Sequence, residues 1–140
     1  MYVVNQERIE NRLALIPAVN EVLHQVQERW NGDLCYAFAQ ERALVLAIEI
    51  VTDVGSDMID GFMMREAASY TDIVEILAME QVFRKELGMQ LVKLVEQREA
   101  LVRQYADLDR SSIMELVKTL PDCLNEFAEA VRTYLKNEIW

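Results

Sequence analysis

Glycine and proline are scarce in this chain, whose 140 residues include 4 Gly and 2 Pro. These residues dominate tight turns, so their scarcity argues against a fold rich in turns. Long apolar runs are lacking as well: residues 43–48 form the longest one, which is far too short to span a bilayer. The N-terminus reads MYVVNQERIENR and contains no apolar signal-peptide region. We therefore expect a cytoplasmic protein with no membrane partner.

Cysteine and histidine are also rare. Cys35 and Cys123 form no CxxC pair and are too few for a disulfide framework, which disfavours zinc or redox chemistry. Free cysteine is usually buried as a small hydrophobe, so both are predicted to be reduced core thiols. His24 is the single histidine. It has no partner for a Ser-His-Asp or Cys-His arrangement, and we interpret it as a structural or surface residue. No cofactor and no metal are expected.

Charge is distributed unevenly along the sequence. The formal net charge is −10, but residues 1–83 carry 5 basic and 14 acidic side chains, whereas residues 84–140 carry 9 and 10. The overall charge opposes non-specific binding of nucleic acid, which depends on neutralising phosphates. Any anion site must therefore be local, and the second half of the chain is where it is expected.

Helical periodicity is clear throughout. Apolar residues recur every seven positions in the first segment, and Pro17 within it predicts a kink. The further predictions are a helix over 36–64 that is apolar on two faces, a loop over 65–68, a short helix capped by Ser69 and Asp72, a helix over 87–105 and a helix over 113–134. Without a linker or repeat, residues 1–140 are predicted to form one all-α domain. Its expected architecture is an antiparallel four-helix bundle with one additional short helix.

Arg98 is the most informative residue in this pattern. It lies on the apolar face of its predicted helix, where its neighbours at helical spacing are Leu94, Leu101 and Tyr105. Arginine is rarely buried without a partner. One interpretation is a structural ion pair to an acid of the second helix, with Glu49 or Asp53 as the partner. The other is an anion site, because a planar guanidinium can grip phosphate with two hydrogen bonds.

Four carboxylates share one face of the second helix, namely Glu49, Asp53, Asp57 and Asp60. A di-metal site in a helical bundle would be expected to carry Glu-x-x-His motifs, and the sequence contains none. A solvated or salt-bridged face is therefore favoured over metal binding.

From Ser69 onward the sequence reads SYTDIVEILAMEQVFRKELGMQLVKLVEQREALVRQYADLD, and a later helix ends NEFAEAVRTYL. In these two stretches the chain resembles the HepT-like proteins of the HEPN superfamily. The family signature is an arginine, four to six residues, a histidine, one residue and a tyrosine. Arg98 matches the arginine and Tyr105 the tyrosine, whereas Arg103 occupies the position of the histidine.

The resemblance implies a HEPN-like helical fold and a homodimer with a cleft across its two-fold axis. The second helix, which has more apolar surface than one bundle core consumes, also favours the dimer. Active members of the family are metal-independent ribonuclease toxins. In such chemistry a histidine moves protons while an arginine stabilises charge on phosphorus. Arginine stays protonated near neutral pH, so Arg103 cannot act as the base. The resemblance also implies a nucleotidyltransferase antitoxin that transfers AMP from ATP to Tyr105.

Three hypotheses follow from these observations. The first is a catalytically degenerate protein that binds RNA, a nucleotide or the nucleotidyltransferase without cleaving. The second is a weak or altered ribonuclease that uses Arg98 and Tyr105 with a different proton carrier. The third is a helical interaction module without a phosphate site, in which Arg98 is simply paired with Glu49 or Asp53.

Overall fold

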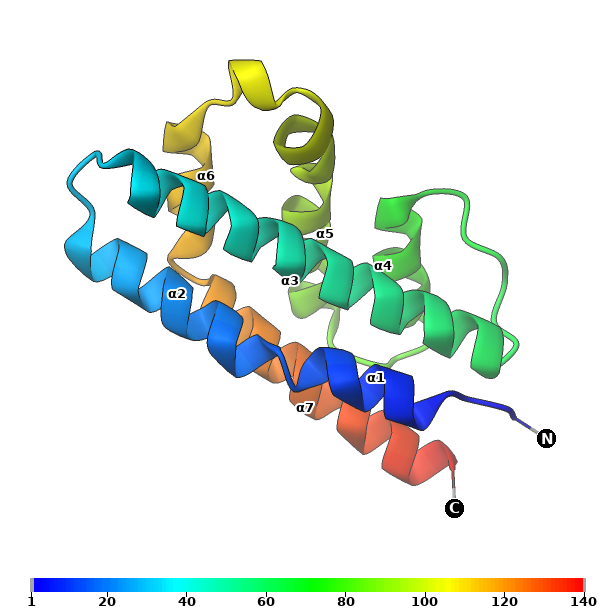
Figure 1. Cartoon of the computed structure of the whole chain (residues 1–140). Helices are drawn as coiled ribbons and strands as arrows, with labels where there is room; N and C mark the ends of the chain where they lie inside the picture. Colours follow the sequence, from blue (N-terminus) through cyan, green and yellow to red (C-terminus); the bar gives the residue numbers. More distant parts are fainter. Residues whose placement is uncertain (1, 140) are drawn as a thin grey trace.

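The structure, a computed structural model, describes residues 2–139, and these contain no β-strand (Figure 1). The α-helices are α1 (Gln6–Leu13), α2 (Ile16–Arg29), α3 (Leu34–Gly61), α4 (Tyr70–Met79), α5 (Lys85–Glu96), α6 (Arg110–Val117) and α7 (Leu120–Glu138). A π-helical turn (Glu99–Arg103) and a 3₁₀ turn (Tyr105–Asp107) lie between α5 and α6. The all-α fold class is thereby confirmed.

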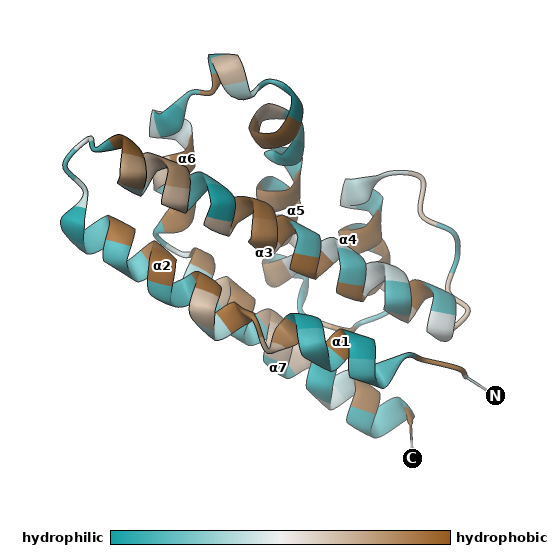
Figure 2. Cartoon of the chain, viewed as in Figure 1, coloured by the Kyte–Doolittle hydropathy of each residue, from teal (hydrophilic) through white to brown (hydrophobic). Residues whose placement is uncertain are grey.

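Helix α3 is the centre of the molecule. It packs against α1 and α2 on one side and against α4 and α5 on the other, while α7 closes the core beneath α2 (Figure 1). Its buried residues accordingly lie on more than one face, as the sequence predicted. Figure 2 shows hydrophilic and hydrophobic stretches alternating along α1, α2 and α7, the pattern of helices with one buried face.

Both prolines mark breaks between helices. Pro17 lies in the first turn of α2 and Pro121 in the first turn of α7, where a missing backbone N–H removes no helical hydrogen bond. The predicted kink at Pro17 is therefore a complete change of helix after Leu13. The last predicted helix is similarly divided, into α6 and α7. Asp109 caps α6 by accepting a hydrogen bond from the amide of Ser111 at 3.1 Å.

Helices α3 and α4 approach each other closely at Gly55. A Cβ atom at this position would overlap the γ2 methyl group of Ile73 on α4. That methyl group is bonded to a branched carbon and has little freedom to move away. The absence of a side chain on Gly55 therefore sets the distance between the two helices.

The two cysteines differ in environment. Cys123 is buried, as predicted, and burial raises the pKa of its thiol. Cys35 is exposed, so its prediction as a core thiol was wrong. Cys35 lies in the first turn of α3, where its amide donates to the capping carboxylate of Asp33 at 2.7 Å. No helix within residues 2–139 has the length and hydropathy to cross a membrane.

Candidate functional site

Arg98, Arg103 and Tyr105 lie on a segment, residues 97–109, that we call the motif turn. The prediction of one helix over 87–105 was wrong here, because α5 ends at Glu96. The amide of Gln104 donates to the carbonyl of Glu99 at 3.0 Å and closes an i→i+5 ring. Tyr105 consequently does not lie on the buried face of a helix: it is 70% exposed on the 3₁₀ turn.

The π-helical turn changes the relation between the two motif arginines. Five residues of α-helix overshoot one turn by about 140° and would send Arg98 and Arg103 to different faces. A π-helical turn, with its wider i→i+5 rings, has more residues per turn and leaves the fifth residue closer to the starting face. The turn therefore brings Arg103 closer to the face of Arg98 than a continuous α-helix would. Such turns are frequent at functional sites.

Arg98 is partly buried between α3 and α4. Its side chain is 22% exposed, and its Nε lies 3.4 Å from a carboxylate oxygen of Glu49 on α3. The guanidinium carbon lies 4.2 Å from the ring centroid of Tyr70, the first residue of α4. Among residues 2–139, no hydrogen bond engages the terminal nitrogens of Arg98. The guanidinium is held in place, but most of its donors remain available.

Two other arginines of the protein are bound far more tightly to carboxylates than Arg98 is. Arg84 donates to both oxygens of Glu126 at 2.6 and 2.8 Å, and Arg132 donates to both oxygens of Glu10 at 2.6 and 3.1 Å. Two-pronged pairs of this kind are the strong form of the interaction. The single 3.4 Å contact of Arg98 is weak by comparison.

Arg103 is held by a carboxylate even more weakly than Arg98 is. Its Nε lies 3.7 Å from Glu99, one turn before it, and its side chain is 67% exposed. An exposed pair at this distance contributes little, because solvent and salt screen it. The structure shows no hydrogen bond that joins Arg103 or Tyr105 to Arg98 within the described residues.

The acidic face of α3 is a salt-bridged face, as favoured from the sequence. Asp57 lies 3.2 Å from Arg8, and Asp53 lies 3.6 Å from Arg12. The proposed pairing of Arg98 with Asp53 is therefore not found, because Asp53 faces α1, whereas Glu49 is the acid that meets Arg98. Burial raises the pKa of Asp57 even though the neighbouring arginines oppose that change. No group of three or more potential metal-binding side chains occurs within residues 2–139.

The contact between Tyr70 and Arg98 was not predicted from the sequence. It is 48% exposed at the start of α4, twenty-eight positions before the arginine that it contacts. Nothing in its own surroundings distinguishes it from an ordinary residue of the first helical turn. Only the packing of α4 against α5 brings Tyr70 to Arg98.

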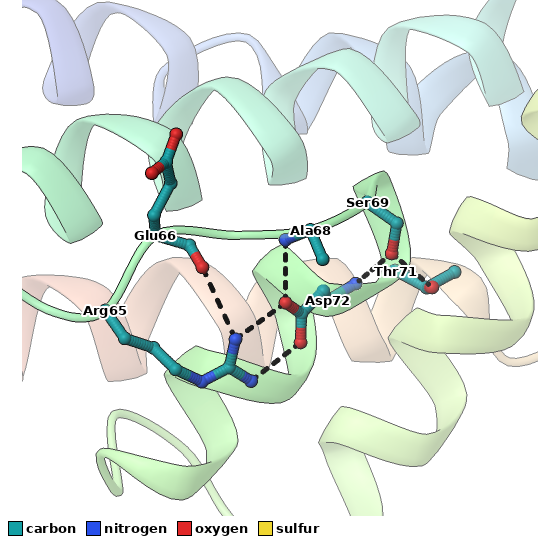
Figure 3. Close-up of polar contacts among 6 residues, drawn as sticks. All are labelled: Arg65, Glu66, Ala68, Ser69, Thr71 and Asp72. Atoms are coloured by element: carbon teal, nitrogen blue, oxygen red, sulfur yellow. Dashed lines mark hydrogen bonds and ion pairs between the residues drawn. The ribbon is translucent and has the colours of Figure 1, made fainter.

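The start of α4 is fixed by a polar cluster (Figure 3). The hydroxyl of Ser69 accepts from the amide of Asp72 at 3.1 Å, which confirms the predicted cap. Asp72 accepts from the amide of Ala68 at 2.8 Å and from two nitrogens of Arg65 at 2.7 and 2.8 Å. The bonds to Arg65 and Ala68 lower the pKa of Asp72 to about 2. Tyr70 therefore projects from a rigid helix end.

His24 is not part of this arrangement. It is exposed on α2, which agrees with its interpretation as a surface or structural residue. The acidic side chain that does contact Arg98 is the carboxylate of Glu49.

Comparison with known proteins places the chain in a family. The family model described as ribonuclease HepT-like matches residues 13–131. The putative RNase YutE of Bacillus subtilis (strain 168) is 36% identical over 139 residues, which cover 99% of this chain and 95% of that protein. The solved structure of YutE, described as a cytosolic protein, is similar with a TM-score of 0.89 and 34% identity, covering 99% of this chain and 96% of the other.

A more distant structure shares the fold. It is the tri-AMPylated HEPN toxin of Shewanella oneidensis in complex with MNT antitoxin, with a TM-score of 0.81 and 19% identity over 89% of this chain and 96% of that one. At this identity the likeness concerns the fold alone. The family model, the identity to YutE and the helical architecture agree, and this chain belongs to the ribonuclease HepT-like family.

Proposed function

We propose that this HepT-like protein binds RNA phosphate through Arg98 and Arg103 and cleaves RNA weakly or not at all. The observation that carries the proposal is the state of Arg98. Glu49 and Tyr70 hold its guanidinium in place, while its terminal N–H groups have no hydrogen-bond partner among residues 2–139. A guanidinium held in this way can donate two hydrogen bonds to one phosphate without reorganisation.

Arg103 adds a second positive charge on the same turn. Because its pair with Glu99 is long and exposed, a phosphate can replace the carboxylate at little cost. The contrast with the tight Arg84 and Arg132 pairs argues against a purely structural role for Arg98. The hypothesis of an interaction module without a phosphate site is therefore the weakest of the three.

Cleavage requires a proton carrier, which Arg103 cannot provide near neutral pH. General acid–base catalysis supplies about 100- to 10,000-fold in rate, so its loss leaves a feeble nuclease at best. The second candidate function, an active metal-independent endoribonuclease, is favoured by one contact. Glu49 places a carboxylate beside Arg98, where it could accept the proton of a ribose 2′-hydroxyl.

The test measures binding and cleavage of total RNA and tRNA by five proteins: the wild type, Arg98→Ala, Arg103→His, Glu49→Gln and Lys136→Ala. Hydrogen bonds to a charged group contribute roughly 1.5–3 kcal/mol, so Arg98→Ala should weaken binding about ten-fold or more. Lys136→Ala removes the same charge at the far end of α7 and should bind like the wild type (Figure 1). Cleavage gained by Arg103→His would indicate a preserved site that lacks its base.

Two outcomes would decide against this proposal. Wild-type cleavage that is abolished by Arg98→Ala and by Glu49→Gln would establish the active nuclease with Glu49 as proton acceptor. Equal RNA binding by the wild type and Arg98→Ala would remove the phosphate site altogether.

Tyr105 is proposed as the acceptor of AMP from a nucleotidyltransferase antitoxin. Its phenol is exposed on the motif turn and therefore accessible to a second protein. Attack of the phenol oxygen on the α-phosphorus of ATP would form the tyrosyl–AMP bond, release pyrophosphate and pass the phenol proton to solvent. The added negative charge would then compete with RNA for the arginines. Protein isolated with its partner should carry AMP by intact mass, and Tyr105→Phe should not.

A homodimer is the proposed assembly, with a groove between α4 and α5 as part of the interface. The groove, about 550 Å³, has an apolar floor that includes the exposed Met79 and Met89. Glu75 of α4 and Lys85, Lys93 and Glu96 of α5 also line the groove, a mixture of charges that suits contact with a second copy of the same surface. It lies on the same α4–α5 seam as the contact between Tyr70 and Arg98, so a dimer here would bring two copies of the site together.

Sedimentation at micromolar concentration tests this assembly. The wild type should sediment as a dimer, and Met89→Glu should shift it to monomer by placing an unpaired charge in the interface. Met63→Glu, which changes an exposed methionine after α3, is the matched control and should leave the dimer intact. A monomeric wild type would contradict the proposal.

A further inference from the structure

We infer that Tyr70 is a stacking platform for an unpaired RNA base beside the phosphate held by Arg98, so that the site selects single-stranded RNA. This inference rests on the proposed RNA-binding function and specifies its substrate class. It concerns a residue outside the Arg-to-Tyr signature of the motif turn.

The first argument is that Arg98 covers only part of the Tyr70 ring. One face carries the guanidinium of Arg98, whose carbon lies 4.2 Å from the ring centroid. Tyr70 is nevertheless 48% exposed, so a large part of the ring remains in contact with solvent. An aromatic ring open to solvent accepts any nucleobase, because every base has a π-face.

The second argument is rigidity. Tyr70 follows the Ser69 cap directly, and the carboxylate of Asp72 ties the preceding loop to Arg65 and to the amide of Ala68 (Figure 3). A ring on such a helix end loses little freedom when a base stacks on it, so more of the stacking energy appears as affinity.

The third argument is the combination of the two groups. Arg98 offers its terminal N–H groups to a phosphate, and Tyr70 lies in contact with the same guanidinium. One nucleotide could therefore place its phosphate on Arg98 and its base on Tyr70. In a duplex the base is paired and stacked internally, which leaves only the phosphate contact. Stacking beside an electropositive contact is the usual way in which proteins bind single strands without reading sequence.

The experiment compares two ligands of equal length: oligoadenylate and a ribose–phosphate chain without bases. Tyr70→Leu keeps apolar volume but removes the ring, and it should weaken oligoadenylate binding about five-fold or more, because stacking on an aromatic residue is worth that much per base. The same variant should bind the base-free chain nearly as the wild type does. Tyr70→Phe retains the π-face and should stay within about two-fold of the wild type on both ligands.

The salt dependence of RNA affinity further distinguishes the role of Arg98 from that of Tyr70. Arg98→Ala should reduce the slope of log affinity against log salt by about 0.7 for each phosphate that the arginine neutralises in the wild type. Tyr70→Leu should leave that slope unchanged, because stacking releases no counterion. Tyr2→Leu removes a tyrosine of nearly equal exposure, 50%, near the N-terminus and should alter neither affinity nor slope.

Each contrary result has a distinct meaning. If Tyr70→Leu weakens both ligands equally, the ring only positions Arg98 and the stacking inference is overturned. If Tyr70→Leu binds oligoadenylate like the wild type while Arg98→Ala does not, the inference fails and the phosphate site stands. If Arg98→Ala binds both ligands like the wild type, the proposed function itself has failed.

Discussion

Two arginine–carboxylate pairs meet the first turn of α4, and they differ in nearly every respect. Arg65 donates to both oxygens of Asp72 at 2.7 and 2.8 Å, and the same carboxylate accepts from the amide of Ala68. Arg98 reaches Glu49 through one nitrogen at 3.4 Å and otherwise lies over the ring of Tyr70. The first pair is saturated, whereas the second leaves most of its donors unused.

The difference shows how one helix end serves two purposes. The Arg65–Asp72 pair satisfies a cap and fixes the loop before α4, so its role is complete within the chain. The guanidinium of Arg98 is positioned against that fixed end, but it lacks the second hydrogen bond that would commit it to Glu49. A pair of the first kind stabilises the fold, and one of the second kind is suited to exchanging its partner for a ligand.

The largest effect on this comparison should come from Gly55, which sets the approach of α4 to α3. Gly55→Val places methyl groups against Ile73, and overpacking of this kind costs about 1–3 kcal/mol. We expect the free energy of unfolding in urea to fall by that amount and RNA binding to fall with it, because Tyr70 moves with α4. Ser56→Val, at the next and exposed position, is the control and should change neither.

Loss of the cap hydroxyl should have a smaller effect. Ser69→Ala removes the acceptor for the amide of Asp72 and should lower the free energy of unfolding by about 1 kcal/mol. Ser112→Ala, in the first turn of α6, removes a hydroxyl that donates to a carbonyl and caps no amide, so its effect should be smaller. Equal losses of unfolding free energy in the two variants would show that the Ser69 cap stabilises the protein no more than the Ser112 hydroxyl does.

The saturated pair also predicts a dependence on pH. The pKa of Asp72 is lowered to about 2 in the folded protein, so its stabilisation is fully present above the ordinary carboxyl pKa near ~4. It should be lost progressively as the pH falls from about 4 towards 2. Melting temperatures of the wild type and Asp72→Asn should therefore differ most above pH ~4 and converge near pH ~2. A gap that stays constant over this range would exclude ionised Asp72 as the source.

Loss of the carboxylate from the Arg98–Glu49 pair should leave stability nearly unchanged and should strengthen RNA binding. Glu49→Gln removes a charge from a partly exposed and weak pair, so the free energy of unfolding should change by less than about 0.5 kcal/mol. RNA should bind about two- to five-fold more tightly, because a carboxylate no longer repels phosphate or competes for Arg98. Glu115→Gln removes the same charge from an exposed pair with Lys118 and serves as the control. A marked loss of stability in Glu49→Gln would show that the pair is structural after all.

The sequence predicted the features that depend on local chemistry. Pro17 was predicted to kink the first segment and marks the break between α1 and α2, and Ser69 and Asp72 marked the start of α4, because each effect operates within a few residues. The apolar spacing also predicted a helix that is apolar on two faces, and neighbouring helices cover α3 on both sides.

The motif turn was predicted less well. Leu101 and Tyr105 continue the spacing of α5, and periodicity alone cannot distinguish an α-helix from a helix that widens into a π turn. The tertiary contacts of Arg98 were only partly foreseen. Glu49 was one of two candidate acids, whereas Tyr70 had no signal, because its contact depends on how α4 and α5 cross.

The π-helical turn also has a consequence for how the chain can change length. Its i→i+5 ring encloses one residue more than the α-helical ring that precedes it. A deletion here could convert the turn to α-helix, and an insertion could enlarge the adjoining loop, while α5 keeps its register against α4. The π-helical turn therefore allows the segment between Arg98 and Tyr105 to change in length without disturbing the packing of the helical bundle.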